Sequence, residues 1–428
     1  MKRLSVLLLI VVLSSTLCAC ESRNFDESLS AIFQKEQKTD EKEKIDDSSV
    51  ENHMENTAID AVDNNSSTLE EEETTVVDPY VELIMYEKTK DTYVDGKEFS
   101  YWIVTKRNSV EEGYVTITKY KGQEAQVVIP ETLDGYPVVG LWNSAFEGCD
   151  FVTDIQFPQT LRKLIFDNFS GGEVEKYFTD TQWYKNLPDG LYYAGPVCLG
   201  YKGVMPAGTT VILKEGTIAV GADAFLSVAD SIVDIEFPES LRYLGGYCFS
   251  GSQIQEVAIS SSWQHYGGAF IHCGNLKKVS FEEGVTKIST SAFYQCYALE
   301  EVVLPSTLQI IEGSAFYECT ALKSIEMPEN LQGINSYAFY GSGLTFVDLN
   351  QGLSYIDDGA FASCMNLKSL YVPKSVQNFG EGPYGYEGAF NNLHLMEDGF
   401  VVYVEEESSA FNMAKYWGMK YEIYTSVE

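Results

Sequence analysis

The side chains that could carry out chemistry in this 428-residue chain are four histidines, nine cysteines and 63 acidic residues. His53, His265, His272 and His394 lie far apart and form no spacing typical of a metal site or a catalytic pair. No nucleophile elbow, phosphate-binding loop or Cys-x-x-Cys motif accompanies them. Carboxylate pairs do occur, but so many acidic residues produce them by chance. The sequence therefore predicts no catalytic residue, no metal site and no cofactor, and we expect a protein that is not an enzyme.

Five of the cysteines recur at one position of a repeated phrase, three residues after a phenylalanine. They are Cys149, Cys273, Cys296, Cys319 and Cys364. If copies of the phrase stack as coils about 5 Å apart, neighbouring thiols approach disulfide range. Stacked side chains point in the same direction, however, and Ser252 or Ser342 fills the position in other copies. We therefore favour a row of buried free thiols over disulfides.

The start of the chain has the features of an export signal. Two basic residues precede an apolar stretch from Leu4 to Leu13, which is too short to span a bilayer comfortably. The following Leu17-Cys18-Ala19-Cys20 resembles the bacterial lipoprotein signal, in which a cysteine after small residues is acylated and begins the mature protein. This resemblance implies that residues 1–19 are removed and that Cys20 carries the lipid. Ordinary secretory cleavage with free release is the alternative.

Residues 20–79 are predicted to form a disordered, acidic tether. Residues 21–79 contain no glycine, and residues 70–73 are four consecutive glutamates. Such a composition cannot bury enough apolar area to offset the entropy lost on ordering. The net charge of −34 for the whole chain also disfavours nucleic acid and anionic lipid headgroups as partners. We therefore expect contact with a membrane through the lipid anchor only.

A phrase of about 23 residues repeats along the rest of the chain. Its Ala-Phe pair recurs at Phe270, Phe293, Phe316 and Phe339, with looser copies at Phe146, Phe169, Phe225, Phe249, Phe361 and Phe390. A fixed period of this length predicts a solenoid of stacked coils, in which each repeat contacts its neighbours. We expect the phenylalanines to stack on one another and to form an aromatic spine.

Each copy also contains the spacing of a short strand. In Leu322–Met327 the pattern L-x-x-L-x-L turns Ile325 and Met327 inward, and Ser324 and Glu326 outward. The same pattern recurs at Leu276–Phe281, Leu299–Leu304, Leu344–Leu349 and Leu367–Val372. A proline often follows and ends the strand, because it lacks the N–H that a ladder needs. The predicted fold is a β-rich solenoid of coils of about 23 residues, which covers residues 146–395.

Segments that depart from the repeat are expected to cap the solenoid. Residues 80–145 form the entry cap, with strands predicted at Phe99–Lys106, Gly113–Lys119 and Gln126–Pro130. A hairpin insertion at about 170–210 includes the strand-like Leu191–Tyr201. Residues 396–428 form an exit cap made of a strand at Val401–Val404, a helix at Ser408–Trp417 and a strand at Lys420–Tyr424.

The repeated phrase Ala-Phe-x-x-Cys-x-x-Leu-x-x-Val/Ile-x-Leu-Pro resembles the BspA-like leucine-rich repeat family, the Treponema pallidum type of bacterial surface repeats. The resemblance covers roughly residues 113–395. It implies a leucine-rich repeat solenoid and an exported protein at the bacterial cell surface. Some members of this family act as adhesins for host proteins or other bacteria, and the resemblance implies no catalytic residues.

The outward positions of the strands vary between copies and are therefore the candidate binding site. Toward the C-terminal end they are Glu301, Val303, Ser324, Glu326, Phe346, Asp348, Ser369 and Tyr371. Exposed aromatic rings among polar residues are plausible contact anchors. The same rings could instead only cover neighbouring strands. We expect a surface module that binds a protein or glycan partner, and the alternative is a structural envelope protein without a specific ligand.

Overall fold

The computed structural model describes residues 78–79, 89–106, 109–142, 144–165, 178–380 and 399–424. The predicted signal, Cys20 and nearly all of the tether lie outside the described residues, as do Phe169 and Phe390. Within the described part, no helix has the length and apolar character needed to cross a membrane.

An N-terminal group of strands forms the entry cap. Its members are β1 (Thr89–Asp95), β2 (Phe99–Lys106), β3 (Ser109–Tyr120), β5 (Thr132–Leu133) and β6 (Tyr136–Trp142). Strand β8 (Lys163–Ile165), in the first repeat, extends the same sheet. Strands β1, β2 and β3 pair antiparallel, whereas β3, β6 and β8 pair in parallel. The change to parallel pairing marks where the chain begins to coil. The predicted strand at Phe99–Lys106 is confirmed as β2, and the strand predicted at Gly113–Lys119 lies within β3.

The predicted hairpin is present in the described part of residues 170–210. After the short helix α3 (Gln182–Asn186), β9 (Gly190–Ala194) and β10 (Val197–Lys202) pair antiparallel. The other edge of β10 pairs in parallel with β12 (Ala219–Val220), and β12 in turn pairs in parallel with β14 (Tyr243–Leu244). One strand of the hairpin is therefore built into the solenoid wall, because its other edge begins the ladder of the next coils.

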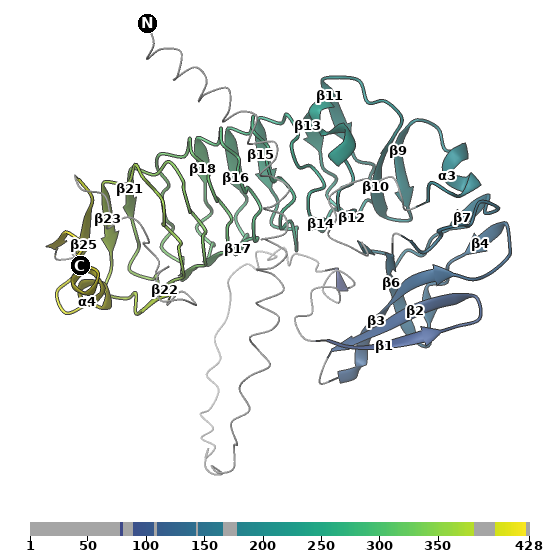
Figure 1. Cartoon of the computed structure of the whole chain (residues 1–428), viewed down its shortest axis with the longest axis horizontal. Coiled ribbons are helices and arrows are strands. Elements are labelled where there is room, and N and C mark those ends of the chain that lie inside the picture. The colour runs from purple at the N-terminus through teal and green to yellow at the C-terminus, as the bar shows by residue number, and fades with distance from the viewer. Residues whose placement is uncertain are drawn as a thin grey trace, which may run out of the picture. The chain divides into compact units, whose positions relative to one another are not determined.

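Most coils contribute strands to two parallel ladders, which run along the solenoid (Figure 1). The outward ladder consists of four sheets in chain order. The first two are β4 (Gln126–Val128) with β7 (Asp154–Gln156), and β11 (Thr209–Ile212) with β13 (Ile232–Glu236). The third contains β15 (Glu256–Ile259), β16 (Lys278–Phe281) and β18 (Glu301–Val303), and the fourth contains β21 (Phe346–Asp348), β23 (Ser369–Val372), β25 (Val401–Val404) and β26 (Tyr421–Ile423). The second ladder contains β17 (Lys287–Ile288), β19 (Ile310–Ile311), β20 (Gly333–Ile334), β22 (Tyr355–Ile356) and β24 (Asn378–Phe379). Parallel pairing at a fixed sequence interval confirms the predicted solenoid.

The aromatic spine is confirmed along the described coils. The rings at Phe225, Phe249, Phe270, Phe293, Phe316, Phe339 and Phe361 are fully buried. Successive ring centroids are 5.1–5.9 Å apart and their planes differ by only 7–13°. Toward the entry cap, Phe146 packs between Tyr120 at 5.5 Å and Phe178 at 5.6 Å.

The exit cap has the predicted strand, helix and strand. Helix α4 (Ser409–Tyr416) begins where the Ser408 hydroxyl accepts a 3.0 Å hydrogen bond from the backbone N–H of Phe411. Past its end, Gly418 adopts a left-handed conformation with φ of +65°, which glycine allows without steric cost. Strand β26 then pairs in parallel with β25, so the cap adds the last strand to the outward ladder.

The cysteine row consists of buried, free thiols. All seven cysteines in the described residues are free and buried, so the preference for thiols over disulfides is confirmed for this part. The Cys296 thiol donates to the carbonyl of Phe270 in the preceding coil at 3.2 Å, and the Cys319 and Cys364 thiols make equivalent bonds. In the copies where serine takes this position, Ser252 and Ser342 each form a 3.3 Å hydrogen bond with the cysteine of the following coil. Burial raises the pKa of the Cys364 thiol to about 11.

The strand predicted at Leu322–Met327 is wrong, although its side chains point as expected. Ile325 is buried and Ser324 and Glu326 are exposed, but residues 323–327 pair with neither β18 nor β21. The turn from Phe339 to Leu344 in the next coil is one residue shorter than in most copies. The two coils share a 3.0 Å hydrogen bond from Thr345 N to Lys323 O and then separate.

Asp78 lies in the segment predicted to be a tether, yet it is held on the solenoid. Arg162 donates to its carboxylate from Nη2 at 2.9 Å and from Nε at 3.2 Å. The backbone N–H of Asp78 donates to Gln264 Oε1 at 3.0 Å. The Arg162 side chain is only 7% exposed, and the Asp78 side chain is 12% exposed. The folded part therefore begins no later than Asp78.

Candidate partner-binding face

The structure places six of the eight predicted contact residues on strands of the outward ladder, whereas Ser324 and Glu326 lie in the unpaired segment 323–327. Glu301, Val303, Ser324, Glu326, Phe346 and Asp348 are exposed, and Ser369 and Tyr371 are half-buried. They do not form one continuous surface of paired strands, because the ladder is interrupted at residues 323–327. Strand β18 belongs to the sheet on one side of this interruption, and β21 and β23 belong to the sheet on the other.

Four aromatic rings gather at the C-terminal end of the outward ladder. We call Phe346, Tyr371, Tyr403 and Tyr424 the aromatic patch. The ring of Tyr371 stacks on that of Tyr403, with centroids 4.2 Å apart and an angle of 2°. Phe346 lies 5.6 Å from Tyr371 and is 44% exposed, and Tyr424 meets Tyr371 edge-on at 5.4 Å. Tyr371 is thus the centre of the patch.

Two of these rings, Tyr403 and Tyr424, were missed from the sequence. Both lie in segments whose strands were predicted, but the strands of the cap were not aligned with the repeat columns. The register pairs Tyr371 with Tyr403 and Tyr403 with Glu422. If the inward and outward positions of Val401–Val404 are aligned with those of β23, Tyr403 falls at the outward position next to Tyr371.

The patch combines ring faces with hydroxyl donors and nearby carboxylates. Desolvation, followed by the charges of Glu405 and Asp348, raises the pKa of the Tyr424 phenol to about 12. Desolvation and Glu422 likewise raise the pKa of Tyr403. Both phenols therefore stay neutral near pH 7 and can donate hydrogen bonds. Such a surface suits the apolar faces and hydroxyl groups of sugars, or the side chains of a protein partner.

The predicted contact residues in β18 have a different environment. Glu301 lies beside Lys278 of β16, with 2.7 Å between Nζ and the carboxylate oxygen. This hydrogen bond, with the charge of Glu301, raises the pKa of Lys278. Both side chains are exposed to solvent to a large extent, so the pair contributes little to stability. Val303 is 44% exposed next to them. No aromatic ring of the patch lies on this sheet.

Of the four histidines, His265 and His272 lie within the described residues, and each ring packs against a different tyrosine. His265 stacks on Tyr243 at 5.1 Å, and His272 meets Tyr294 edge-on at 6.0 Å. In the described part of the chain, no group of three His, Cys, Asp or Glu side chains could hold a metal ion.

We expect His265 to make the folded state sensitive to acid. Burial, with a smaller effect from the charge of Lys163, lowers its pKa to about 4 from an ordinary value of 6.5. Because the unfolded chain binds the proton more tightly, this contribution to stability is complete above pH 6.5 and is lost as the pH falls through 4. His265 retains some exposure, so we expect a loss of about 2 kcal/mol in the free energy of unfolding.

Urea unfolding at pH 7 and pH 4 measures this effect directly. The unmodified chain should lose about 2 kcal/mol more than the His265→Gln variant over that interval, because glutamine cannot take up the proton. Equal losses in the two proteins would show that His265 is not the group responsible.

A comparison with protein-family models finds the BspA type leucine rich repeat region in six copies, over residues 207–311 and 286–398. These matches cover the coils that carry the aromatic spine and most of the outward ladder. Residues 207–398 are a BspA-type leucine-rich repeat region. The resemblance seen in the sequence is therefore confirmed for this region. Within the described residues, most of its coils have parallel strands on both walls, and the segment 323–327 is an exception.

Solved structures similar to this chain include leucine-rich repeat proteins. A protein from Bacteroides ovatus is 21% identical, covering 78% of this chain and 100% of its own, with a TM-score of 0.31. The Treponema pallidum leucine-rich repeat protein is 24% identical over 54% of this chain and 92% of its own, with a TM-score of 0.26. The pneumococcal vaccine antigen PcpA is 15% identical over 79% and 99%, with a TM-score of 0.32. No curated protein matches the chain.

Proposed function

We propose that this chain is a lipid-anchored protein of a bacterial cell surface that binds a protein or glycan partner through the outward ladder. The observation that carries the proposal is the aromatic patch. The core of each coil is already filled by the spine, the leucines and the cysteines, so packing does not require four further rings on the outward side. Aromatic side chains are the ones that most often anchor interfaces.

The geometry of the patch suggests how contact is made. Phe346 presents an exposed ring at one end, while Tyr371 and Tyr403 are held rigidly by their mutual stacking. A partner that covers these rings loses little side-chain entropy from the protein, because the rings are already ordered. Carboxylates at Asp348 and Glu422 border the patch and can accept hydrogen bonds from a partner. The patch therefore combines apolar contact with directional polar contacts.

A structural envelope protein without a specific ligand is the second candidate, and the same stacking favours it. At 4.2 Å with nearly parallel planes, Tyr371 and Tyr403 cover each other's faces. In this alternative the rings only protect the last strands of the solenoid, and β26 would serve as a covering edge strand. The two candidates differ in whether a partner binds saturably.

The test offers the purified full-length chain to immobilised host matrix proteins, glycan arrays and bacterial surfaces. The proposal requires saturable binding to at least one of these surfaces. An absence of saturable binding to all of them would contradict the binding function and leave the structural alternative.

The membrane anchor is the second part of the proposal. Acylation of Cys20, after removal of residues 1–19, would join residues 20–77 to the membrane as an extended, self-repelling spacer. More than one acyl chain is needed for stable residence in a membrane. Labelling with a fatty-acid analogue should mark the unmodified chain and not the Cys20→Ala variant. Continued labelling of the variant would refute this assignment.

The proposed division of the chain follows from the same argument. We propose residues 80–145 as the entry cap, 146–395 as the repeats and 396–428 as the exit cap. Of these segments, the repeats and the exit cap together provide the binding surface, because Tyr403 and Tyr424 of the aromatic patch belong to the exit cap. A catalytic role is not part of the proposal, because the repeats supply a scaffold and the outward positions supply contacts.

A further inference from the structure

The outward ladder is also interrupted between β13 and β15, far from the aromatic patch along the chain. In most copies, the first apolar residue of the strand lies six positions after the repeat phenylalanine, but Ile254 lies only five positions after Phe249. Because this turn is one residue shorter, β15 separates from β13 soon after the turn. One backbone hydrogen bond of 2.7 Å joins Gln253 N to Ile232 O, and the two strands then belong to different sheets.

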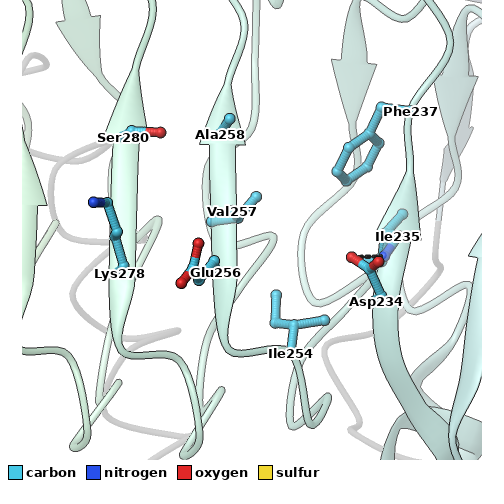
Figure 2. Close-up of a pocket in the computed structure, with 9 residues that line it drawn as sticks. All are labelled: Asp234, Ile235, Phe237, Ile254, Glu256, Val257, Ala258, Lys278 and Ser280. Carbon is cyan, nitrogen blue, oxygen red and sulfur yellow. Dashed lines mark hydrogen bonds between the residues drawn. The ribbon is translucent and has the colours of Figure 1, made fainter.

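This separation opens a cavity of about 280 Å³ on the outward face (Figure 2). Its lining residues are Asp234, Ile235, Phe237, Ile254, Glu256, Val257, Ala258, Lys278 and Ser280. Ile254 and Val257 are buried and form an apolar floor, whereas Asp234 and Glu256 are exposed at the opening. Pockets for drug-sized ligands span roughly 300–1,000 Å³. This cavity therefore suits one long side chain.

The backbone groups at the cavity show that the edge of each sheet stays open. Gln255 O and Ile259 O accept hydrogen bonds from the β16 side, at 2.7 and 3.0 Å. The groups of the alternating residues Glu256 and Ala258 consequently point toward β13. On β13, Asp234 Oδ1 accepts a 2.9 Å bond from the backbone N–H of Ile235, a donor that a neighbouring strand would otherwise use. The solenoid does not fill this space with its own ladder.

Charge decides which side chain the cavity accepts. Asp234 and Glu256 are the outward-facing residues at equivalent positions of β13 and β15, the two strands that border the cavity. Lys278, the basic residue of the lining, is bonded to Glu301 at 2.7 Å. The opening thus presents two carboxylates, together with the Lys278 ammonium that is paired with Glu301, above an apolar floor. Long basic side chains match this arrangement, because their methylene stems pack on apolar surface while the charged end stays at the rim.

We propose that the cavity between β13 and β15 binds a lysine or arginine side chain presented by a peptide segment of a protein partner. The stem of the basic residue packs on Ile254 and Val257, and its charge lies against Asp234 and Glu256. This site is separate from the aromatic patch and does not depend on it. A partner that spans both sites would gain affinity from their combination.

The test measures fluorescence anisotropy of a labelled Ala-Ala-Arg-Ala-Ala peptide with the full-length chain at low salt. We expect the peptide to bind at least about tenfold more tightly than the same peptide with glutamine in place of arginine. The double substitution Asp234→Asn, Glu256→Gln should weaken arginine-peptide binding by about tenfold. A matched control, Glu326→Gln with Asp348→Asn, removes the same charge from exposed positions of later coils and should change peptide binding by less than about twofold.

A variant that fills the cavity separates binding in the cavity from general attraction to an acidic protein. Ala258 is exposed on β15, where an aromatic residue is tolerated. Ala258→Phe keeps every carboxylate and should also weaken binding by about tenfold, because the ring occupies the space. Equal losses in the control variant, equal binding of the glutamine peptide, or full binding by Ala258→Phe would each overturn the proposal. Phe346→Ser with Tyr371→Ser should leave peptide binding unchanged, so failure here is distinguishable from failure of the proposed function.

Discussion

Replacing Phe293 with alanine should lower the free energy of unfolding by about 4 kcal/mol, as measured by urea denaturation. The ring is fully buried and is stacked between Phe270 at 5.9 Å and Phe316 at 5.7 Å. Removing it leaves a cavity in the middle of the spine and ends two ring contacts. Because each coil is stabilised by its neighbours, the loss should also reduce the cooperativity of unfolding.

The matched control is Phe346→Ala, which removes an identical side chain that is 44% exposed on the outward ladder. We expect this change to cost less than about 1 kcal/mol, because exposed positions are seldom important to stability. If both variants lost equal stability, the spine would not be the main support of the solenoid. If neither lost stability, the described packing at Phe293 would be wrong.

Replacing Asp78 with alanine should cost about 3 kcal/mol, although the residue lies in a segment that has the composition of a tether. Arg162 would keep its charge while being 7% exposed, and it would lose the hydrogen bonds from Nε and Nη2. An uncompensated buried charge is costly, because the surroundings cannot replace the water that it has lost. Urea denaturation of the full-length chain measures the change.

A second substitution tests whether the charge of Arg162 is the cause. In Asp78→Ala with Arg162→Leu the buried charge is absent, so we expect part of the lost stability to return. A double variant that is less stable than Asp78→Ala alone would show that Arg162 acts through its other contacts. A neighbouring exposed change, Pro79→Ala, should be close to neutral and serves as the control.

The repetitive part of the fold could be predicted because the copies of the repeat have buried residues at the same spacing. Phe293 and Phe316 recur at equal spacing, and a ring that is buried in each coil must meet the ring of the next. The strand at Val401–Val404 and the cap at Ser408 were likewise found from local alternation and from a side chain that accepts hydrogen bonds from a helix start. Local signals of this kind survive folding because the surrounding structure agrees with them.

The interruptions of the outward ladder between β13 and β15 and at residues 323–327 could have been located only by counting residues within a copy. Both short turns contain Gly-Ser, at Gly251-Ser252 and Gly341-Ser342, and a missing residue changes the path of the following coil. The pattern of apolar residues continues through the interruption, so Ile325 still faces inward while its strand pairing is lost. Periodicity reports side-chain direction, whereas hydrogen bonding depends on the distance between neighbouring coils.

The candidate binding residues illustrate the same limit. Phe346 and Tyr371 were found because they belong to copies of the repeat, but Tyr403 and Tyr424 belong to the cap and joined the patch through strand register. The contact of Asp78 with Arg162 joins residues 84 positions apart, and no local pattern signals it. Contacts between distant segments follow from the assembled fold.

The central claim is that the repeated residues build the scaffold and that the outward rings make the contact with a partner. Its most direct test is the affinity of the Phe346→Ser, Tyr371→Ser variant for whichever matrix protein, glycan or bacterial surface the unmodified chain binds saturably. We predict a loss of at least about tenfold in affinity, with an unfolding midpoint in urea within error of the unmodified chain. An unchanged affinity in a fully folded variant would contradict the claim and remove the aromatic patch from the binding site.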